Sequence, residues 1–142
     1  MTKTIVFICT GNACRSQMAE GFGKRMLPGW RVLSAGTIAS GVHESAIKVM
    51  GEEGIDITDQ YSKTLGDVPV DEIDYVVTLC GDARERCPVF PKAVKNEHWP
   101  IDDPIYATGS DREMDEFRRV RDDIGTRMGQ LAKKLTEGPR GR

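Results

Sequence analysis

The feature that most constrains the fold lies near the N-terminus, where an apolar run passes directly into a short loop and then into a helical pattern. Residues 4–8 (Thr-Ile-Val-Phe-Ile) are β-branched or aromatic without polar alternation, which is typical of a central strand buried on both faces. Met18, Phe22 and Met26 follow at intervals of four, on one face of a predicted helix over 16–27. A buried strand followed by a helix predicts a parallel α/β sheet.

The remaining apolar runs extend this pattern along the chain. Strands are predicted over 31–35 and 74–79, with a short fourth strand over 97–100. Helices are predicted over 43–53 and along a stripe of apolar residues from Met114 to Leu135, which we interpret as core packing. Ser110 and Glu113 have the spacing of a capping box before this last helix, and residues 138–142 are expected to fray.

We therefore predict a single domain over residues 1–142. Its fold class is α/β, with three layers and a central, mostly parallel four-stranded sheet flanked by helices. The formal net charge is -2 and the isoelectric point about 5.7, so neither nucleic acid nor a membrane surface is an expected partner. We find no signal peptide or membrane-length apolar run and expect a cytoplasmic monomer.

The loop after the first strand carries the strongest functional signal. It begins at Cys9 and leads into a helix, and ligands of open α/β sheets sit at the carboxyl ends of strands. The first N–H groups of a helix lack partners within it and attract anions, and a loop of small residues can curl into an anion-binding nest. The residues expected to hold the anion are Thr10, Gly11, Asn12, Ala13, Cys14 and Arg15.

Cys9 is the candidate nucleophile of this loop. The Arg15 guanidinium can bond two oxygens of one tetrahedral anion, and the same positive field stabilises a thiolate at Cys9. Ser16 is placed to donate its hydroxyl to that thiolate. The alternative is a buried strand-end cysteine beside an ordinary turn, because a Cys-x5-Arg spacing alone occurs by chance. Cys14 has no assigned step and is interpreted as a small loop residue.

A second pair of cysteines, Cys80 and Cys87, follows a later predicted strand. Cys80 ends that strand, so its sulfur is expected near the rim of the loop. Cys87 lies about 10 Å further on if the segment is helical, which is too far for a disulfide. A Cys80–Cys87 bond would need the segment to unwind, which Gly81 and Pro88 favour. Zinc binding and inert core cysteines are the alternatives, although the six-residue gap is wide for zinc ligands.

The Cys-x5-Arg-Ser loop together with Asp102-Asp103-Pro104 resembles the low-molecular-weight protein tyrosine phosphatase fold. On its own, Asp103-Pro104 is only a turn signal. In that family an Asp directly before Pro is the general acid, and the matching residue here is Asp103. The resemblance also implies the same fold for this chain.

A wider resemblance, over nearly the whole chain, is to the thioredoxin-coupled arsenate reductases. The segments that carry it are 7–21 (Phe-Ile-Cys-Thr-Gly-Asn-Ala-Cys-Arg-Ser-Gln-Met-Ala-Glu-Gly), Ser34-Ala35-Gly36, Val77-Thr78-Leu79-Cys80, Cys87-Pro88 and 98–104 (His-Trp-Pro-Ile-Asp-Asp-Pro). Its most specific part is the set of three cysteines Cys9, Cys80 and Cys87 on a phosphatase-like loop.

This resemblance implies a thiol relay that reduces arsenate to arsenite. The Cys9 thiolate attacks arsenic while Asp103 protonates the leaving oxygen. Cys80 then attacks the Cys9 sulfur and arsenite leaves, after which Cys87 attacks Cys80. Thioredoxin reduces the resulting Cys80–Cys87 disulfide. No tightly bound cofactor is implied, and phosphate and sulfate are expected to fit the same loop.

One position departs from the resemblance. Some members of the family bind potassium beside the loop, through residues matching Asn12, Glu20 and Ser34 and through an Asp that falls at Lys63 here. We expect no metal ion and predict that the Lys63 ammonium replaces the potassium and pairs with Glu20. The alternative is a Lys63 side chain in solvent.

Two other functions stay open from the sequence. A phosphatase that hydrolyses phosphomonoesters through a Cys9 phosphocysteine would use the same loop and Asp103. However, this chain has only Ile105-Tyr106 where the phosphatases carry paired aromatic residues after Asp-Pro. A non-catalytic oxyanion sensor would leave Asp103 and the cysteine pair without a purpose.

Overall fold

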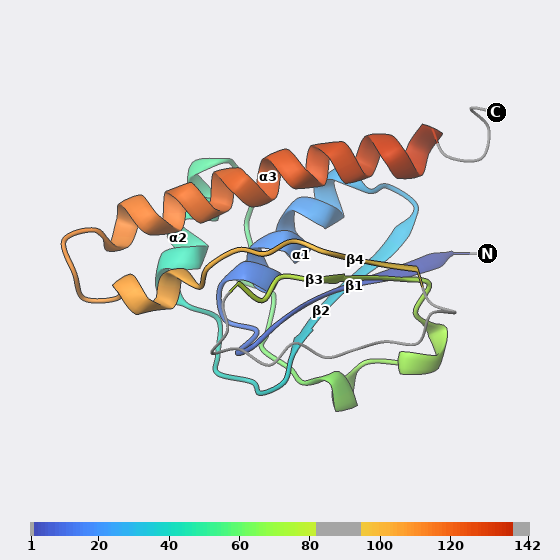
Figure 1. Ribbon diagram of the computed structural model, residues 1–142, viewed down its shortest axis with the longest axis horizontal. Coiled ribbons are helices and arrows are strands. Elements are labelled where there is room, and N and C mark those ends of the chain that lie inside the picture. The colour runs from blue at the N-terminus through green and yellow to red at the C-terminus, as the bar shows by residue number, and fades with distance from the viewer. Residues whose placement is uncertain (1, 82–94, 138–142) are drawn as a thin grey trace.

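The centre of the fold is a sheet of parallel strands (Figure 1), seen in a computed structural model that describes residues 2–81 and 95–137. The strands are β1 (Lys3–Cys9), β2 (Trp30–Gly36), β3 (Tyr75–Thr78) and β4 (Lys95–His98). Their order in space is β2–β1–β3–β4, and each neighbouring pair is parallel. The predicted parallel sheet is confirmed, with the first strand of the chain inside it.

Three helices cover one face of this sheet (Figure 1). They are α1 (Arg15–Met26), α2 (Glu44–Glu52) and α3 (Glu113–Glu137). Successive strand residues point to opposite faces, and Ile5 and Phe7 of β1 belong to the same core cluster as Phe22 of α1 and Phe117 of α3. The stripe predicted along the last helix is buried: Phe117, Val120, Ile124 and Met128 are 0% exposed.

The opposite face has a smaller core. Val6 and Ile8 of β1 and Val76 of β3 pack there with Val68 and Ile73. Within the described ranges, the segment that supplies these last residues carries two short 3-10 turns, η1 (Leu65–Asp67) and η2 (Val70–Glu72). The sheet is therefore covered on both sides, by the three α-helices on one face and by the segment with the two 3-10 turns on the other.

Two local predictions at element ends differ from the structure. The fourth strand covers Lys95–His98 instead of 97–100, because it pairs with β3 in the register that places Lys95 beside Tyr75 and His98 beside Thr78. The capping box is wrong in its pairing, since Glu113 Oε1 accepts from Gly109 N at 2.8 Å. Ser110 Oγ accepts from Arg112 N at 3.2 Å, and α3 starts at Glu113, three residues after the predicted cap.

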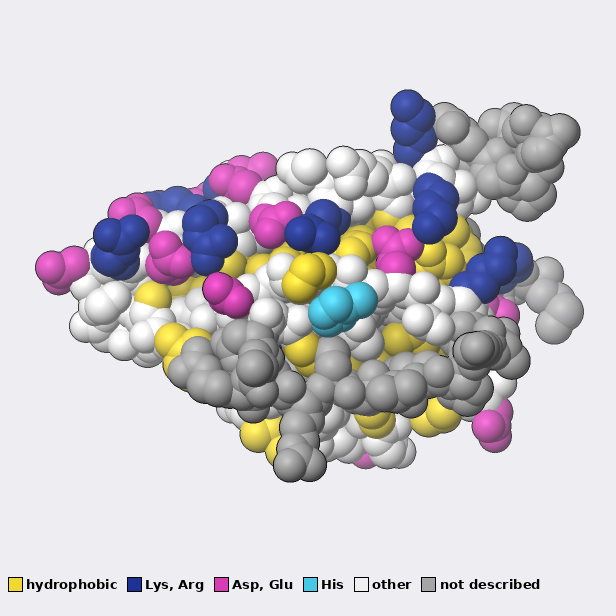
Figure 2. All heavy atoms as spheres, in the orientation of Figure 1, with side chains coloured by type: hydrophobic (Ala, Val, Ile, Leu, Met, Phe, Trp, Pro, Cys, Tyr) yellow, Lys and Arg dark blue, Asp and Glu magenta, His cyan; other side chains and the backbone are white. Residues whose placement is uncertain are grey.

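Charged side chains of both signs are interspersed on the helical side of the face in Figure 2. Several pair along α3, for example Arg119 with Glu116 at 2.7 Å and Arg127 with Asp123 at 2.8 Å. None of the described helices combines the length and the apolar character needed to cross a membrane. Because the surface charges on this face are mixed, the positive groups that bind an anion are expected within the site itself.

Candidate active site

The loop between β1 and α1 turns its carbonyl groups outward. Thr10 O accepts from Ile38 N at 3.0 Å, Gly11 O from Ser40 N at 2.9 Å, and Ala13 O from His43 N at 3.0 Å. In a trans peptide the C=O and the following N–H point in opposite directions. The N–H groups that follow these carbonyls therefore point to the concave side, which is the arrangement of an anion nest.

Asn12 holds this loop in shape. Its φ of 51° lies in the left-handed region, which Asn tolerates better than most residues. Its side-chain Nδ2 donates to Ser16 Oγ at 2.7 Å and to Ser34 Oγ at 3.0 Å. Its Oδ1 accepts from Gln17 Nε2 and from Lys63 N, both at 2.9 Å. All four hydrogen-bonding positions of this buried amide are used, so the loop is fixed without a ligand.

Cys9 lies at the base of the loop, at the end of β1, and is 2% exposed. Its Sγ is 2.8 Å from Ser16 Oγ. Ser16 Oγ already accepts from the Asn12 amide, so its own proton is available to the sulfur. A hydroxyl that donates to sulfur favours the thiolate over the thiol, which is the state that a nucleophile needs.

Arg15 begins α1, and its side chain is buried beneath the loop. Its NH1 donates to Leu79 O at 2.9 Å and to Ile101 O at 2.8 Å. Its NH2 lies 3.2 Å from Asp103 Oδ2. The guanidinium thus joins the end of β3 and the segment of Asp103 to the anion loop.

Asp103 lies at the start of the short turn η3 (Pro104–Ala107). Its Oδ1 accepts from Ile105 N at 3.0 Å and its Oδ2 faces Arg15. The side chain is 15% exposed, whereas the neighbouring Asp102 is exposed. The structure therefore brings Asp103, and not Asp102, to the Arg15 guanidinium.

The other described cysteines differ in their chemical state. Cys14 is a free, buried thiol whose pKa is raised far above its ordinary value, chiefly by burial and further by Asp103 and Cys9, although Arg15 opposes the change. Cys80 is 6% exposed and disulfide-bonded. The N–H of Leu79 donates to Ile8 O at 2.8 Å. Cys80 directly follows Leu79 and Cys9 directly follows Ile8, so the two cysteines lie at the same end of neighbouring strands. Cys87 lies outside the described residues.

A buried carboxylate, Glu20, lies behind the loop. Its Oε1 accepts from Ser34 Oγ at 2.5 Å and is 3.6 Å from Lys63 Nζ. Its Oε2 pairs with Lys24 Nζ at 2.7 Å. The Lys63 ammonium also donates to Tyr61 O at 3.1 Å and lies 4.5 Å from the centre of the Tyr61 ring. The Lys63–Glu20 contact expected from the sequence is present, and Lys63 is buried.

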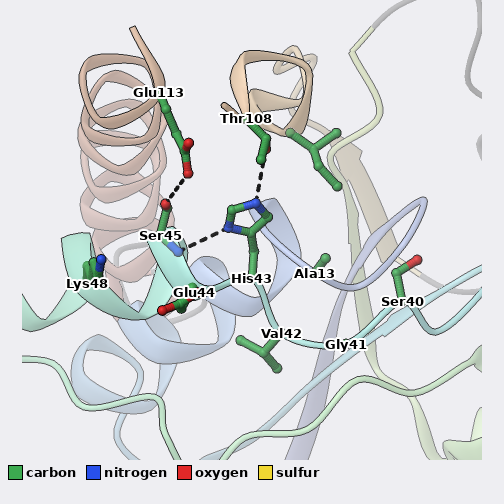
Figure 3. A pocket seen from close by; sticks show the side chains of 11 residues that line it. Ala13, Ser40, Gly41, Val42, His43, Glu44, Ser45, Lys48, Thr108 and Glu113 are labelled. Atoms are coloured by element: carbon green, nitrogen blue, oxygen red, sulfur yellow. Dashed lines mark hydrogen bonds between the residues drawn. The ribbon is translucent and has the colours of Figure 1, made fainter. Parts of the chain in front are cut away.

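A cavity of about 380 Å³ opens beside the loop (Figure 3). Ala13 of the loop lines it on one side and Ile105 and Thr108 of the η3 region line it on another. His43, at the start of α2, and Lys48, within it, also line the cavity, as does Glu113 of α3. The cavity therefore adjoins both the loop and the turn that begins after Asp103.

Several residues that shape the site were not identified from the sequence. Gln17 fixes the Asn12 amide, and Ser62 Oγ donates to Gly11 O at 3.2 Å and to Asn12 O at 3.1 Å. Gly36 packs so closely that a Cβ there would lie 2.7 Å from Thr10 O. Only Gln17 had a usable signal, because it lies next to Ser16 on the first turn of the helix.

Comparison with known proteins agrees with this geometry. The family described as Low molecular weight phosphotyrosine protein phosphatase matches residues 4–140. An arsenate reductase of Shouchella clausii is 52% identical over 132 residues, which are 92% of this chain and 95% of the relative. A solved arsenate reductase in a phosphate-binding state is 35% identical with a TM-score of 0.79, covering 94% of this chain and 99% of that chain.

A further solved structure is the thioredoxin-dependent arsenate reductase of Corynebacterium glutamicum. It is 29% identical with a TM-score of 0.73, and the match covers 95% of this chain and 62% of that chain. The sequence match and the strand–loop–helix geometry around Cys9 point the same way. The chain belongs to the low molecular weight phosphotyrosine protein phosphatase family and, within it, groups with the arsenate reductases.

Proposed function

We propose that this protein reduces arsenate to arsenite, with Cys9 as the nucleophile. The observation that carries the proposal is the preformed nest of N–H groups around Cys9, with Cys80 following the neighbouring strand. A phosphatase needs only the first of these features. The similarity to arsenate reductases over 92% of the chain favours the reductase over the phosphatase alternative.

The first step is attack of the Cys9 thiolate on the arsenic of a bound arsenate. The anion-binding residues are Thr10 to Cys14, through their backbone N–H groups, and Arg15, through its guanidinium. An S–As bond forms and one As–O bond breaks, and Asp103 supplies the proton that lets the oxygen leave as water. Ser16 steadies the thiolate through its 2.8 Å contact with the sulfur.

The second step transfers two electrons to arsenic. The Cys80 thiolate attacks the Cys9 sulfur, so that an S–S bond forms, the S–As bond breaks and its electron pair leaves with arsenite. Cys87 then attacks Cys80 and frees Cys9. A free Cys9 and a disulfide-bonded Cys80 are consistent with the end of this sequence. The part of Cys87 is proposed from the sequence alone.

The electron donor is proposed to be thioredoxin. The proposed Cys80–Cys87 disulfide would be reduced by exchange with a dithiol protein, and no tightly bound cofactor is needed. Because the relay requires reduced thiols, we propose that the protein acts in the cytoplasm, as a monomer. Phosphate and sulfate share the shape and charge of arsenate and are expected to occupy the same loop.

Lys63 is proposed to take the place of a monovalent cation. Its ammonium contacts Glu20 Oε1, the Tyr61 carbonyl and the Tyr61 ring, which are interactions that suit a buried positive charge. A chain of hydrogen bonds runs from the Glu20 carboxylate, which contacts the Lys63 ammonium, through Ser34 and Asn12 to Ser16. The buried Lys63 ammonium would keep this chain of hydrogen bonds in place without added potassium.

A coupled assay tests the proposed function. Purified protein is mixed with arsenate, thioredoxin, thioredoxin reductase and NADPH, and NADPH loss is followed. We expect arsenate-dependent consumption that Cys9→Ser abolishes. Cys87→Ser should stop after one turnover with a Cys9–Cys80 bond detectable by mass spectrometry. Absence of arsenate-dependent consumption in the wild type would refute the proposal, and a phosphatase would be indifferent to Cys80→Ser and Cys87→Ser.

A further inference from the structure

A closed circuit of hydrogen bonds joins the start of α2 to the far end of η3 and the start of α3, and Figure 3 shows the part of it that links Thr108, His43, Ser45 and Glu113. His43 Nδ1 accepts from Ser45 N at 3.0 Å, and His43 Nε2 lies 3.0 Å from Thr108 Oγ1. The Ser45 hydroxyl donates to Glu113 Oε2 at 2.5 Å, and Glu113 Oε1 accepts from Gly109 N at 2.8 Å. Thr108 and Gly109 are adjacent, so the circuit is complete.

This circuit is connected to both halves of the active site. The backbone N–H of His43 donates to Ala13 O at 3.0 Å, which ties it to the anion loop. Thr108 ends η3, where its N–H donates to Ile105 O at 3.0 Å, and Asp103 begins the same turn. A single residue, His43, therefore bonds the loop through its backbone and the general-acid turn through its side chain.

The hydrogen bonds of His43 define its protonation state. Nδ1 accepts from a backbone N–H, so it carries no proton, and the proton on Nε2 is donated to the Thr108 hydroxyl. The ring also packs on buried Phe117, with centroids 4.7 Å apart. Only the neutral imidazole can accept at one nitrogen and donate at the other. A positive charge at a helix start is also opposed by the helix dipole.

We infer that His43 is a positioning residue that holds the Asp103 turn against the anion loop, and that it does so in its neutral form. The inference rests on the proposed function for the role of Asp103. Protonation would put a proton on Nδ1 facing the Ser45 N–H, and the cap of α2 would be lost. The charged groups lining the same cavity are Glu44 and Lys48 of α2 and Glu113 of α3, whereas the loop and the η3 region contribute the uncharged Ala13, Ile105 and Thr108.

Variants at two positions separate positioning from simple stability. Thr108→Val removes the hydroxyl and leaves the cap intact, whereas Thr108→Ser keeps the hydroxyl. His43→Asn keeps an N-cap acceptor but removes the hydrogen bond to Thr108. We expect Thr108→Val and His43→Asn each to lower the first-turnover rate of arsenite formation, measured without thioredoxin, by roughly twofold to tenfold. Thr108→Ser should match the wild type, and the double variant should lose no more than either single variant.

A measurement that does not depend on turnover tests the inference even if the protein does not reduce arsenate. Nitrogen-15 NMR of the wild-type ring should report Nδ1 without a proton and Nε2 with one. The Ile105 amide, which donates to Asp103, should shift in Thr108→Val and not in Thr108→Ser. A proton on Nδ1 at neutral pH, or an unchanged first-turnover rate in an active Thr108→Val enzyme, would overturn the inference. If the wild type gives the expected NMR result but does not reduce arsenate, only the proposed function is refuted.

Discussion

Replacing Lys63 by alanine should lower the free energy of unfolding, because it removes a buried charge that pairs with Glu20. The Lys63 and Glu20 side chains are each 6% exposed, and 3.6 Å separates their charged atoms. At an effective dielectric constant of about 20, Coulomb's law gives roughly 4–5 kcal/mol for such a pair. Removing one partner of a buried pair typically costs about 3–5 kcal/mol, because the other charge is left without compensation.

Part of that compensation survives in the variant. Lys24 Nζ remains 2.7 Å from Glu20 Oε2, and the Ser34 hydroxyl still donates to Oε1. We therefore expect a loss of about 2–3 kcal/mol, which for a chain of this size corresponds to a fall in Tm of roughly 5–10 °C. Because the space left is bounded by a carboxylate and the Tyr61 carbonyl, it should accept potassium. Potassium present at about 100 times its Kd would raise the free energy of unfolding of this variant by about 2.7 kcal/mol.

The assay is thermal and urea unfolding of each variant in equal concentrations of KCl and NaCl. The matched control is Lys24→Ala, which removes a lysine from the same carboxylate where its side chain is 52% exposed. Because the Lys24 side chain is half exposed and Lys63 stays beside Glu20 in this variant, its loss should cost less, about 1 kcal/mol, with no preference for potassium. Wild type stabilised by potassium over sodium, or a Lys63→Ala protein that loses no more than Lys24→Ala, would refute the reasoning.

Three further predictions concern other parts of the structure. Cys14→Ala should keep most of the arsenate turnover, because burial raises the pKa of this thiol and keeps it neutral; a loss of kcat comparable to that of Cys9→Ser would contradict this. Gly81→Ala should slow the first turnover at least tenfold, since a Cβ at Gly81 would collide with the backbone of Ile101 near the Asp103 segment; an unchanged rate would show that the contact is dispensable. Glu97→Gln should lower the free energy of unfolding by about 1 kcal/mol at neutral pH, as measured in urea, and the difference should vanish in acid.

The sign of the Glu97 prediction follows from its surroundings. Burial alone acts to raise the pKa of this carboxyl, but hydrogen bonds from Tyr75, Trp99 and Lys134 together lower it. A carboxylate with a lowered pKa in the folded state stabilises the protein above the ordinary Glu range, and this contribution is lost as the pH falls through the lowered value. A difference that grew in acid would contradict the assignment.

The parts of this molecule that sequence reasoning could predict are those with a local signature. Residues 4–8 carry enough apolar, β-branched character to identify β1, and the spacing of Phe117 and Ile124 identifies the buried stripe of α3. The loop from Cys9 to Arg15 could be placed because a strand and a helix flank it. Asp103 could be named only because Pro104 follows it in a pattern that resembles a known family.

The remaining parts depend on contacts between distant residues. Arg15 binds the carbonyl oxygens of Leu79 and Ile101, and a carbonyl leaves no mark in a sequence because every residue has one. The four bonds of Asn12 reach Ser34 and Lys63, which lie 22 and 51 residues away. The side chain of Glu113 bonds Gly109 instead of Ser110 because the turn before α3 differs from the one that a capping box requires. Tertiary contacts decided each of these cases.

The rigid loop around Asn12 has a consequence for selectivity between anions. A ring of N–H groups that is formed in advance recognises tetrahedral shape and negative charge, and phosphate has both. Binding alone can therefore do little to reject it, even where phosphate is far more abundant than arsenate. In the proposed reaction, the choice is made afterwards, because arsenic(V) accepts an electron pair from thiols whereas phosphorus(V) does not. Phosphate would occupy the loop, slow the enzyme competitively and leave unchanged, so that the cysteine relay discriminates where the binding loop does not.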